Sequence, residues 1–227
     1  MTSADVTLDD GLGLLSELPT MTREEFASAK DEVDRRVLGP ARQLVEEVGV
    51  VLQEQVSPTI SAVPKVNGSI SPLHRDLRFA EDRSTLYKDH LLINFWDGSP
   101  RRHAPTLRVR IAPDGIGLAA GAAFDPEGLR SWRNALCSPA VAELEQIVGA
   151  LSTGWELRRS DPELARLPRG LEPRGELAEA LCRHRTIQYR VIEAPPGPLG
   201  AADFDAWVAA RLIRFGDLHR WFVEALR

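Results

Sequence analysis

The spacing of hydrophobic residues along the chain is helical at both ends and strand-like in the middle. In the N-terminal part, apolar residues recur three and four positions apart, as on the buried face of a helix, at Ala41, Leu44, Val45, Val48 and Leu52. The middle alternates with a period of two, which predicts strands at residues 60–66, 70–79, 91–96, 107–111 and 116–124, with a sixth at 186–192. Short turns such as Asn67-Gly68 and Pro113-Asp114-Gly115 favour an antiparallel meander.

Helix-start signals flank this central region. Thr22 and Glu25 have the spacing of a capping box, and the Asp-Pro and Ser-Pro pairs at residues 125–126 and 138–139 open two later helices. The predicted fold class is therefore α+β, a central antiparallel meander sheet packed by N-terminal and C-terminal helices. Residues 1–20 are polar and glycine-rich apart from leucines such as Leu12, Leu14 and Leu15, so we expect a mobile N-terminal arm whose leucines dock locally. A single α+β domain is expected over residues 21–227.

Three features concern the polar side chains of the predicted strands and turns. Arg108 and Arg110 alternate with apolar residues, which predicts a half-buried strand with one polar face. The glycines of residues 115–121 lack the spacing of a phosphate-binding loop, and they indicate close approach of another backbone or helix. The Arg-Arg-His run at residues 101–103 is typical of a solvated basic turn.

The densest mixture of charges and apolar residues is the stretch 74–88. If this part begins as a strand, Arg75 shares a face with leucines, while Asp76 and Arg78 share the opposite face. A cation among apolar neighbours needs an internal carboxylate or a bound anion. One interpretation is a structural ion network, and the other is an arginine cluster that binds a phosphate or carboxylate. The residue types alone leave both open.

The same stretch resembles a known family. Its members have an Arg-Asp-x-Arg-Phe, Asp-Lys, Pro-Tyr-Lys block, and the corresponding residues here are 75–79, 82–84 and 87–88. The chain is therefore similar to the domain of unknown function 2461 family, and looser matches extend this similarity to Arg133 and to the Pro-Arg-Gly loop at residues 168–170. Two departures occur: Arg83 replaces a lysine, and Thr85-Leu86 stands where a single proline precedes Tyr-Lys.

The resemblance implies a single-domain α+β fold and a site location, and no reaction. Combined with the residue types, it gives a set of candidate ligand-binding residues: Arg75, Asp76, Arg78, Asp82, Lys88 and Arg133. The first functional hypothesis is an enzyme or binding protein for an anionic, phosphate- or carboxylate-bearing small molecule. The alternative is a non-catalytic protein that associates with other proteins and whose charged stretch is an internal ion network.

Composition narrows the class of protein further. A net charge of -5 argues against a surface that binds nucleic acid. No apolar run approaches the roughly 20 residues that cross a bilayer, and the N-terminus lacks a secretory pattern, so a soluble cytoplasmic protein is expected. The five histidines form no metal-binding pair, and no cofactor motif is present, so neither a metal nor a cofactor is predicted.

Overall fold

A six-stranded antiparallel sheet forms the centre of the protein. The computed structural model describes residues 7–78, 83–99, 101–151, 156–159, 164, 166–194, 197, 199 and 203–226. Its strands are β1 (Ile60–Ser61), β2 (Leu91–Asp97), β3 (Thr106–Ala112), β4 (Gly115–Ala123), β5 (Glu156–Arg159) and β6 (Thr186–Glu193). They lie in the order β1-β2-β3-β4-β6-β5, with antiparallel neighbours throughout. The predicted meander is confirmed for β2 to β4.

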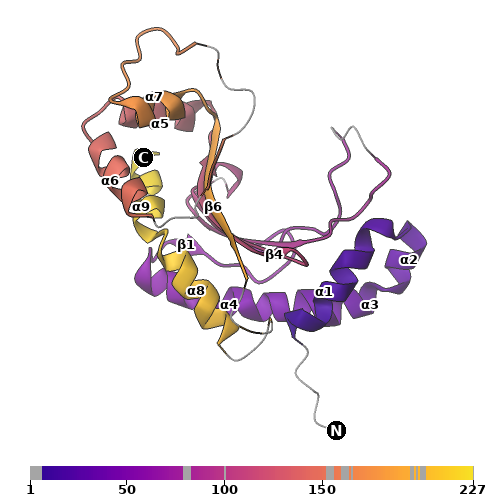
Figure 1. The fold of residues 1–227 in the computed structure, drawn as a ribbon. Coiled ribbons are helices and arrows are strands. Elements are labelled where there is room, and N and C mark those ends of the chain that lie inside the picture. The colour runs from indigo at the N-terminus through magenta and orange to yellow at the C-terminus, as the bar shows by residue number, and fades with distance from the viewer. Residues whose placement is uncertain are drawn as a thin grey trace.

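Helices from both ends of the chain pack on this sheet, as the α+β prediction requires. Those before the sheet are α1 (Leu8–Glu17), α2 (Arg23–Ser28), α3 (Lys30–Val33) and α4 (Gly39–Gln55), with a π-helical turn η2 (Asp34–Leu38) leading into α4. Those after β4 are α5 (Pro126–Leu136), α6 (Val141–Ala150), α7 (Glu176–Cys182), α8 (Phe204–Ile213) and α9 (Gly216–Ala225). Figure 1 shows a strongly curved sheet, with α1, α4 and α8 along its outer side.

Strand register divides the sheet into a buried face and an open face. In β3 the side chains of Leu107, Val109 and Ile111 are fully buried against the helices. Arg108 and Arg110 point the other way and pair in register with Ala119 and Gly117 of β4. The alternation predicted for residues 107–111 is confirmed, because one face of this sheet packs on helices while the other carries polar side chains.

The N-terminal segment differs from the expected mobile arm. Residues 8–17 form α1, and Leu14, Leu15 and Leu18 are buried in the main core. Gly11 explains the discrepancy, because a Cβ there would lie 2.5 Å from the backbone oxygen of Arg36. The glycine that suggested flexibility instead permits close packing of α1 against the turn η2. The first six residues lie outside the described part of the chain.

The predicted strands at residues 60–66 and 70–79 are also largely wrong. Only Ile60–Ser61 forms a strand, and residue 70 onwards makes single bridges, Ile70 with Ile93 and His74 with Tyr87. Pro64 and Pro72 supply the reason, since proline has no amide hydrogen for a strand ladder. Burial nevertheless alternates from Leu73 to residue 78, as strand parity predicted. Phe79 lies outside the described residues.

Candidate functional site

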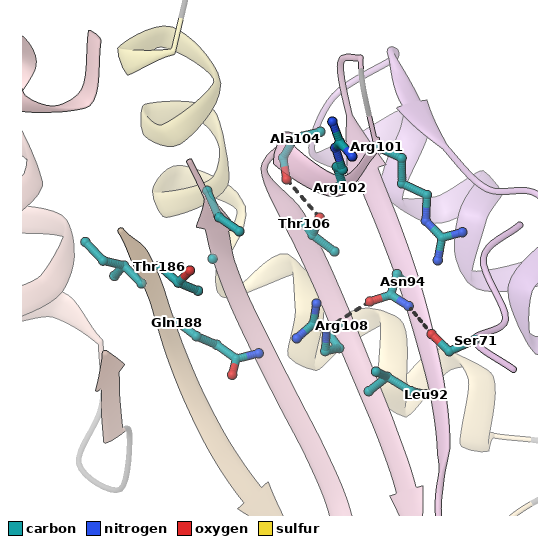
Figure 2. Close-up of a pocket in the computed structure, with 14 residues that line it drawn as sticks. Ser71, Leu92, Asn94, Arg101, Arg102, Ala104, Thr106, Arg108, Thr186 and Gln188 are labelled. Atoms are coloured by element: carbon teal, nitrogen blue, oxygen red, sulfur yellow. Dashed lines mark hydrogen bonds between the residues drawn. The ribbon is translucent and has the colours of Figure 1, made fainter. Parts of the chain in front are cut away.

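A pocket of about 670 Å³ lies on the open face of the sheet. We call it the open-face pocket, and its lining residues come from four strands, the turn η3 (Arg101–His103) and the segment before β2: Ser71, Leu92, Asn94, Arg101, Arg102, Ala104, Thr106, Arg108, Gly121, Ala122, Ala123, Thr186, Ile187 and Gln188. Figure 2 shows Arg108 between Asn94 on one side and Gln188 on the other. The β4 residues that line it are small, so the pocket is hollowed over that strand.

A chain of hydrogen bonds orients Arg108 within this pocket. The side-chain amide of Asn94 donates to Ser71 Oγ over 3.1 Å, and Asn94 Oδ1 accepts from Arg108 Nε at 2.8 Å (Figure 2). Asn94 is buried, so its amide is fixed by these partners. Among the described residues, Nε is the nitrogen of Arg108 that has a hydrogen-bond partner. The terminal nitrogens of the guanidinium therefore keep their donors for another acceptor.

Among the described residues, no carboxylate balances the positive charge in the pocket. Arg101, Arg102 and Arg108 line it, and no acidic side chain is among the described residues of its lining. Burial first, and then the charge of Arg101, lower the pKa of Arg108. Arg101 packs over the Trp96 ring at 4.9 Å and donates to the Asn67 carbonyl at 2.8 Å, so it too is held by neutral groups. Partly buried cations without a counter-charge are costly, and a bound anion would remove that cost.

The glycine of β4 at this pocket confirms the predicted close backbone approach. A Cβ on Gly121 would lie 2.2 Å from the Ile187 carbonyl oxygen and 2.9 Å from the Gln188 Cα. No side chain fits between β4 and β6 here. Because Gly121 has no side chain, the two strands can approach closely where β6 contributes Thr186 and Gln188 to the wall of the pocket.

The residues expected to bind a ligand lie elsewhere, and none of the described ones lines the open-face pocket. Arg75 is half-buried and donates from its side chain to the Thr85 carbonyl at 3.1 Å, so among the described residues its partner is a backbone carbonyl. Lys88 donates to the Pro72 carbonyl at 2.6 Å, and burial lowers its pKa. These bonds tie the segment before β2 to itself.

The remaining candidates are dispersed. Asp76 and Arg78 form an exposed ion pair with 2.6 Å between Oδ2 and the terminal nitrogen, and Asp82 lies outside the described residues. Arg133 donates to the Cys182 carbonyl at 3.1 Å, and burial lowers its pKa. Figure 1 shows its helix α5 beside α7, at the other end of the sheet from the segment before β2. Binding by these six residues remains a prediction.

The sequence did not indicate the three arginines of the open-face pocket as ligand contacts. Arg101 and Arg102 belong to the run interpreted as a solvated turn, and Arg108 to the predicted half-buried strand. The available signal was the alternation of Arg108 and Arg110 beside a strand of glycine and alanine, since such a neighbour leaves space over the sheet. The lack of a carboxylate beside Arg108 could not be predicted from any short stretch of the sequence, because the lining of the pocket comes from residues far apart in the chain.

A separate polar cluster on the buried face joins β2 to α9. Asp97 accepts from Ser57 Oγ at 2.5 Å and Thr59 Oγ1 at 2.8 Å, and its Oδ2 lies 3.7 Å from Nε2 of the fully buried His219. His219 first, and then the two hydroxyls, lower the pKa of Asp97 to about 2. Because both carboxylate oxygens have partners, we assign this cluster a structural role.

The described part of the chain contains neither a cluster of metal-binding side chains nor a helix that could span a membrane. No group of three or more His, Cys, Asp or Glu side chains among these residues could hold a metal ion. Within the same residues, no helix combines the length and apolar character needed to span a membrane.

These observations define a class of protein, an α+β protein whose antiparallel sheet has helices on one face and a cationic pocket on the other. The chain belongs to the DUF2461 family of conserved hypothetical proteins, whose model matches residues 12–196. The expected family membership is thus confirmed, and the matched region includes every residue that lines the open-face pocket. No curated protein and no solved structure matches the chain.

Proposed function

We propose that this protein binds an anionic small molecule, bearing a phosphate or a carboxylate, in the open-face pocket. Arg108 is the central contact, with Arg101 beside it and the exposed Arg102 at the rim. The guanidinium group suits this task because its planar donors match two oxygens of a phosphate or carboxylate at once. The observation that carries the proposal is the half-buried Arg108, which has a second arginine nearby and no carboxylate among the described residues that line the pocket.

The alternative, a purely structural ion network, has less support at this pocket. Elsewhere on this face of the sheet, half-buried arginines do have carboxylate partners: Arg110 pairs with Asp114 at 2.6 Å and Arg190 with Glu156 at 2.8 Å. Arg108 lies on the same face as these two, and its hydrogen-bond partner among the described residues is the neutral Asn94. A structural network would pair each cation internally, as it does for Arg110 and Arg190.

The test measures stabilisation by inorganic phosphate and sulfate at constant ionic strength, with chloride as the reference salt. Ligand that binds only the folded state raises the unfolding temperature with concentration. We expect wild type to show this increase and Arg108→Met to lose it, because methionine retains an unbranched chain and removes the charge. Far-UV circular dichroism checks that the variant is folded.

Two control variants separate this pocket from other cationic positions. Arg110→Met removes a charge from the same strand and face, but that charge is already paired with Asp114, so the phosphate response should persist. Arg78→Ala tests the charged stretch singled out in the sequence. The proposal is wrong if Arg108→Met keeps the full response, or if wild type shows none. Loss of the response in Arg78→Ala alone would place the ligand at the charged stretch.

A further inference from the structure

A second pocket adjoins the open-face pocket. This adjacent pocket, of about 400 Å³, is lined by Leu92, Arg108, Arg110, Asp114, Gly117, Leu118, Ala119, Gln188, Arg190 and Ile192. Three residues, Leu92, Arg108 and Gln188, line both pockets, so the two adjoin across β2, β3, β4 and β6, and we refer to them together as the groove. Arg108 therefore lies between the two halves of a longer groove, and inorganic phosphate would fill only part of it.

From this geometry, and given the anion binding proposed above, we infer that the ligand is an anion attached to a neutral ring-sized group, as in a sugar phosphate or a nucleoside monophosphate. The anionic group lies at Arg108 and Arg101, and the ring lies over Gly117 and Ala119. The strand register gives the length of the groove and hence the size of the ligand: the groove extends from the Thr106–Gly121 pair to the Arg110–Gly117 pair. Four residues of a strand span ~13 Å, which accommodates a phosphate and one or two rings.

Charge differs between the two halves of the groove. In the adjacent pocket Arg110 is paired with Asp114 and Arg190 with Glu156, so these cations are already neutralised. The open-face pocket keeps its positive charge, since no acidic residue lines it in the part of the chain that the structure describes. An anion is consequently favoured at one end of the groove, and a neutral group that exchanges hydrogen bonds with the rim is favoured at the other.

The shape and apolar surface of the adjacent pocket fit a flat ring. Gly117 and Ala119 provide a floor without bulky side chains. Ile192 lines the pocket and is 49% exposed, which makes it one of two large hydrophobic side chains recorded as exposed among the described residues. Leu92 lines the same pocket and is half-buried. A ring held over the floor would cover part of this apolar surface, which favours binding.

The experiment compares four probes by calorimetry on the full chain: inorganic phosphate, glucose 6-phosphate, adenosine 5′-monophosphate and adenosine. We expect at least one of the two ring-bearing phosphates to bind about tenfold or more tightly than inorganic phosphate. Adenosine alone should bind much more weakly than its monophosphate, because it lacks the anion. The two phosphorylated probes distinguish a sugar ring from a nucleobase as the preferred neutral group.

Two variants test where the ring lies. Ala119→Leu places a larger side chain on the floor of the adjacent pocket, and Ile192→Ser removes the apolar wall at a half-exposed position that carries little folding risk. Both should remove most of the added affinity of the ring-bearing probe. Ile192→Ser should leave the affinity for inorganic phosphate unchanged, whereas Ala119 is the strand partner of Arg108, so the readout for Ala119→Leu is the ratio of the two affinities. Ala142→Leu, on the exposed side of α6, is the matched control and should change neither affinity.

The outcomes separate this inference from the proposal on which it rests. If phosphate binds through Arg108 but both ring-bearing phosphates bind no more tightly, the inference is overturned and the proposed anion site stands. The same conclusion follows if Ala119→Leu and Ile192→Ser both retain the added affinity. If none of the phosphorylated probes binds wild type, both the inference and the proposed function are wrong.

Discussion

Replacing Gly121 by alanine should destabilise the protein strongly, although the new side chain is a single methyl group. The backbone of Gly121 is not in the left-handed region, so only space opposes the substitution. The added Cβ would lie 2.2 Å from the Ile187 carbonyl oxygen and 2.9 Å from the Gln188 Cα. Both are backbone atoms of β6, so relief requires that the strand move by about 1 Å and weakens its pairing with β4.

The magnitude follows from this overlap. Overpacking typically costs 1–3 kcal/mol, and a clash with two backbone atoms belongs at the upper end, about 3 kcal/mol. For a chain of this size each kcal/mol lowers the unfolding temperature by about 2–4 °C, so Gly121→Ala should unfold roughly 6–12 °C below wild type. Because β6 supplies Gln188 to the open-face pocket, the phosphate response should fall as well.

Thermal and urea unfolding, followed by far-UV circular dichroism, measure the effect. Gly149→Ala in α6 is the control, since no atom lies within 4 Å of its added Cβ. This helical substitution should stabilise the protein by about 0.5 kcal/mol. This prediction is wrong if Gly121→Ala unfolds at the wild-type temperature, or if both variants are destabilised equally. Either result would mean that the close approach of β4 and β6 does not require a glycine at position 121.

Two pH-dependent predictions concern carboxyl groups outside the pocket. Asp97, whose pKa is lowered to about 2 beside His219, stabilises the folded state above pH 4 by about 2 kcal/mol, and this contribution is lost as the pH falls towards 2. Asp97→Asn should therefore be less stable at pH 7 and show a flatter acid limb in urea unfolding; an unchanged limb would contradict this. In α8, burial and then the hydrogen bond and negative charge of Glu47 raise the pKa of Asp205 to about 7. A carboxyl group with a raised pKa contributes most to the stability of the folded state below pH 4, and this contribution is lost as the pH rises through 7. Asp205→Asn should therefore gain stability relative to wild type between pH 4 and pH 8. A difference in stability that stays constant with pH would refute this assignment.

The sequence predicted the sheet well because its two faces differ in environment. Leu107, Val109 and Ile111 face helices, whereas Arg108 and Arg110 face solvent, and this difference appears directly as a period of two. Prediction failed where local patterns competed. Residues 73–78 alternate in burial like a strand, but the proline at position 72 prevents a continuous ladder. The glycines of α1 suggested a mobile arm, although one of them permits tight packing.

The candidate site was less accessible from the sequence than the fold. Local charge density drew attention to residues 74–88, where Asp76 and Arg78 neutralise each other on the surface. The pocket instead depends on register across β3, β4 and β6, which brings Arg108 beside Ala119 and Gln188 beside Gly121. What makes Arg108 unusual is that no carboxylate from a distant part of the described chain lines its pocket, and no short motif records such an absence.

Because helices cover one face of this sheet and not the other, neighbouring residues of one strand are constrained in two different ways: one by core packing and the next by the groove. Along β3, Leu107, Val109 and Ile111 pack in the core, whereas Thr106, Arg108 and Arg110 line the groove. Exchanging Arg110, Ile192 or another groove residue therefore changes the surface of the groove without repacking the core beneath. Such a strand can acquire a new ligand preference through single substitutions, which makes this groove a practical starting point for directed evolution of binding specificity.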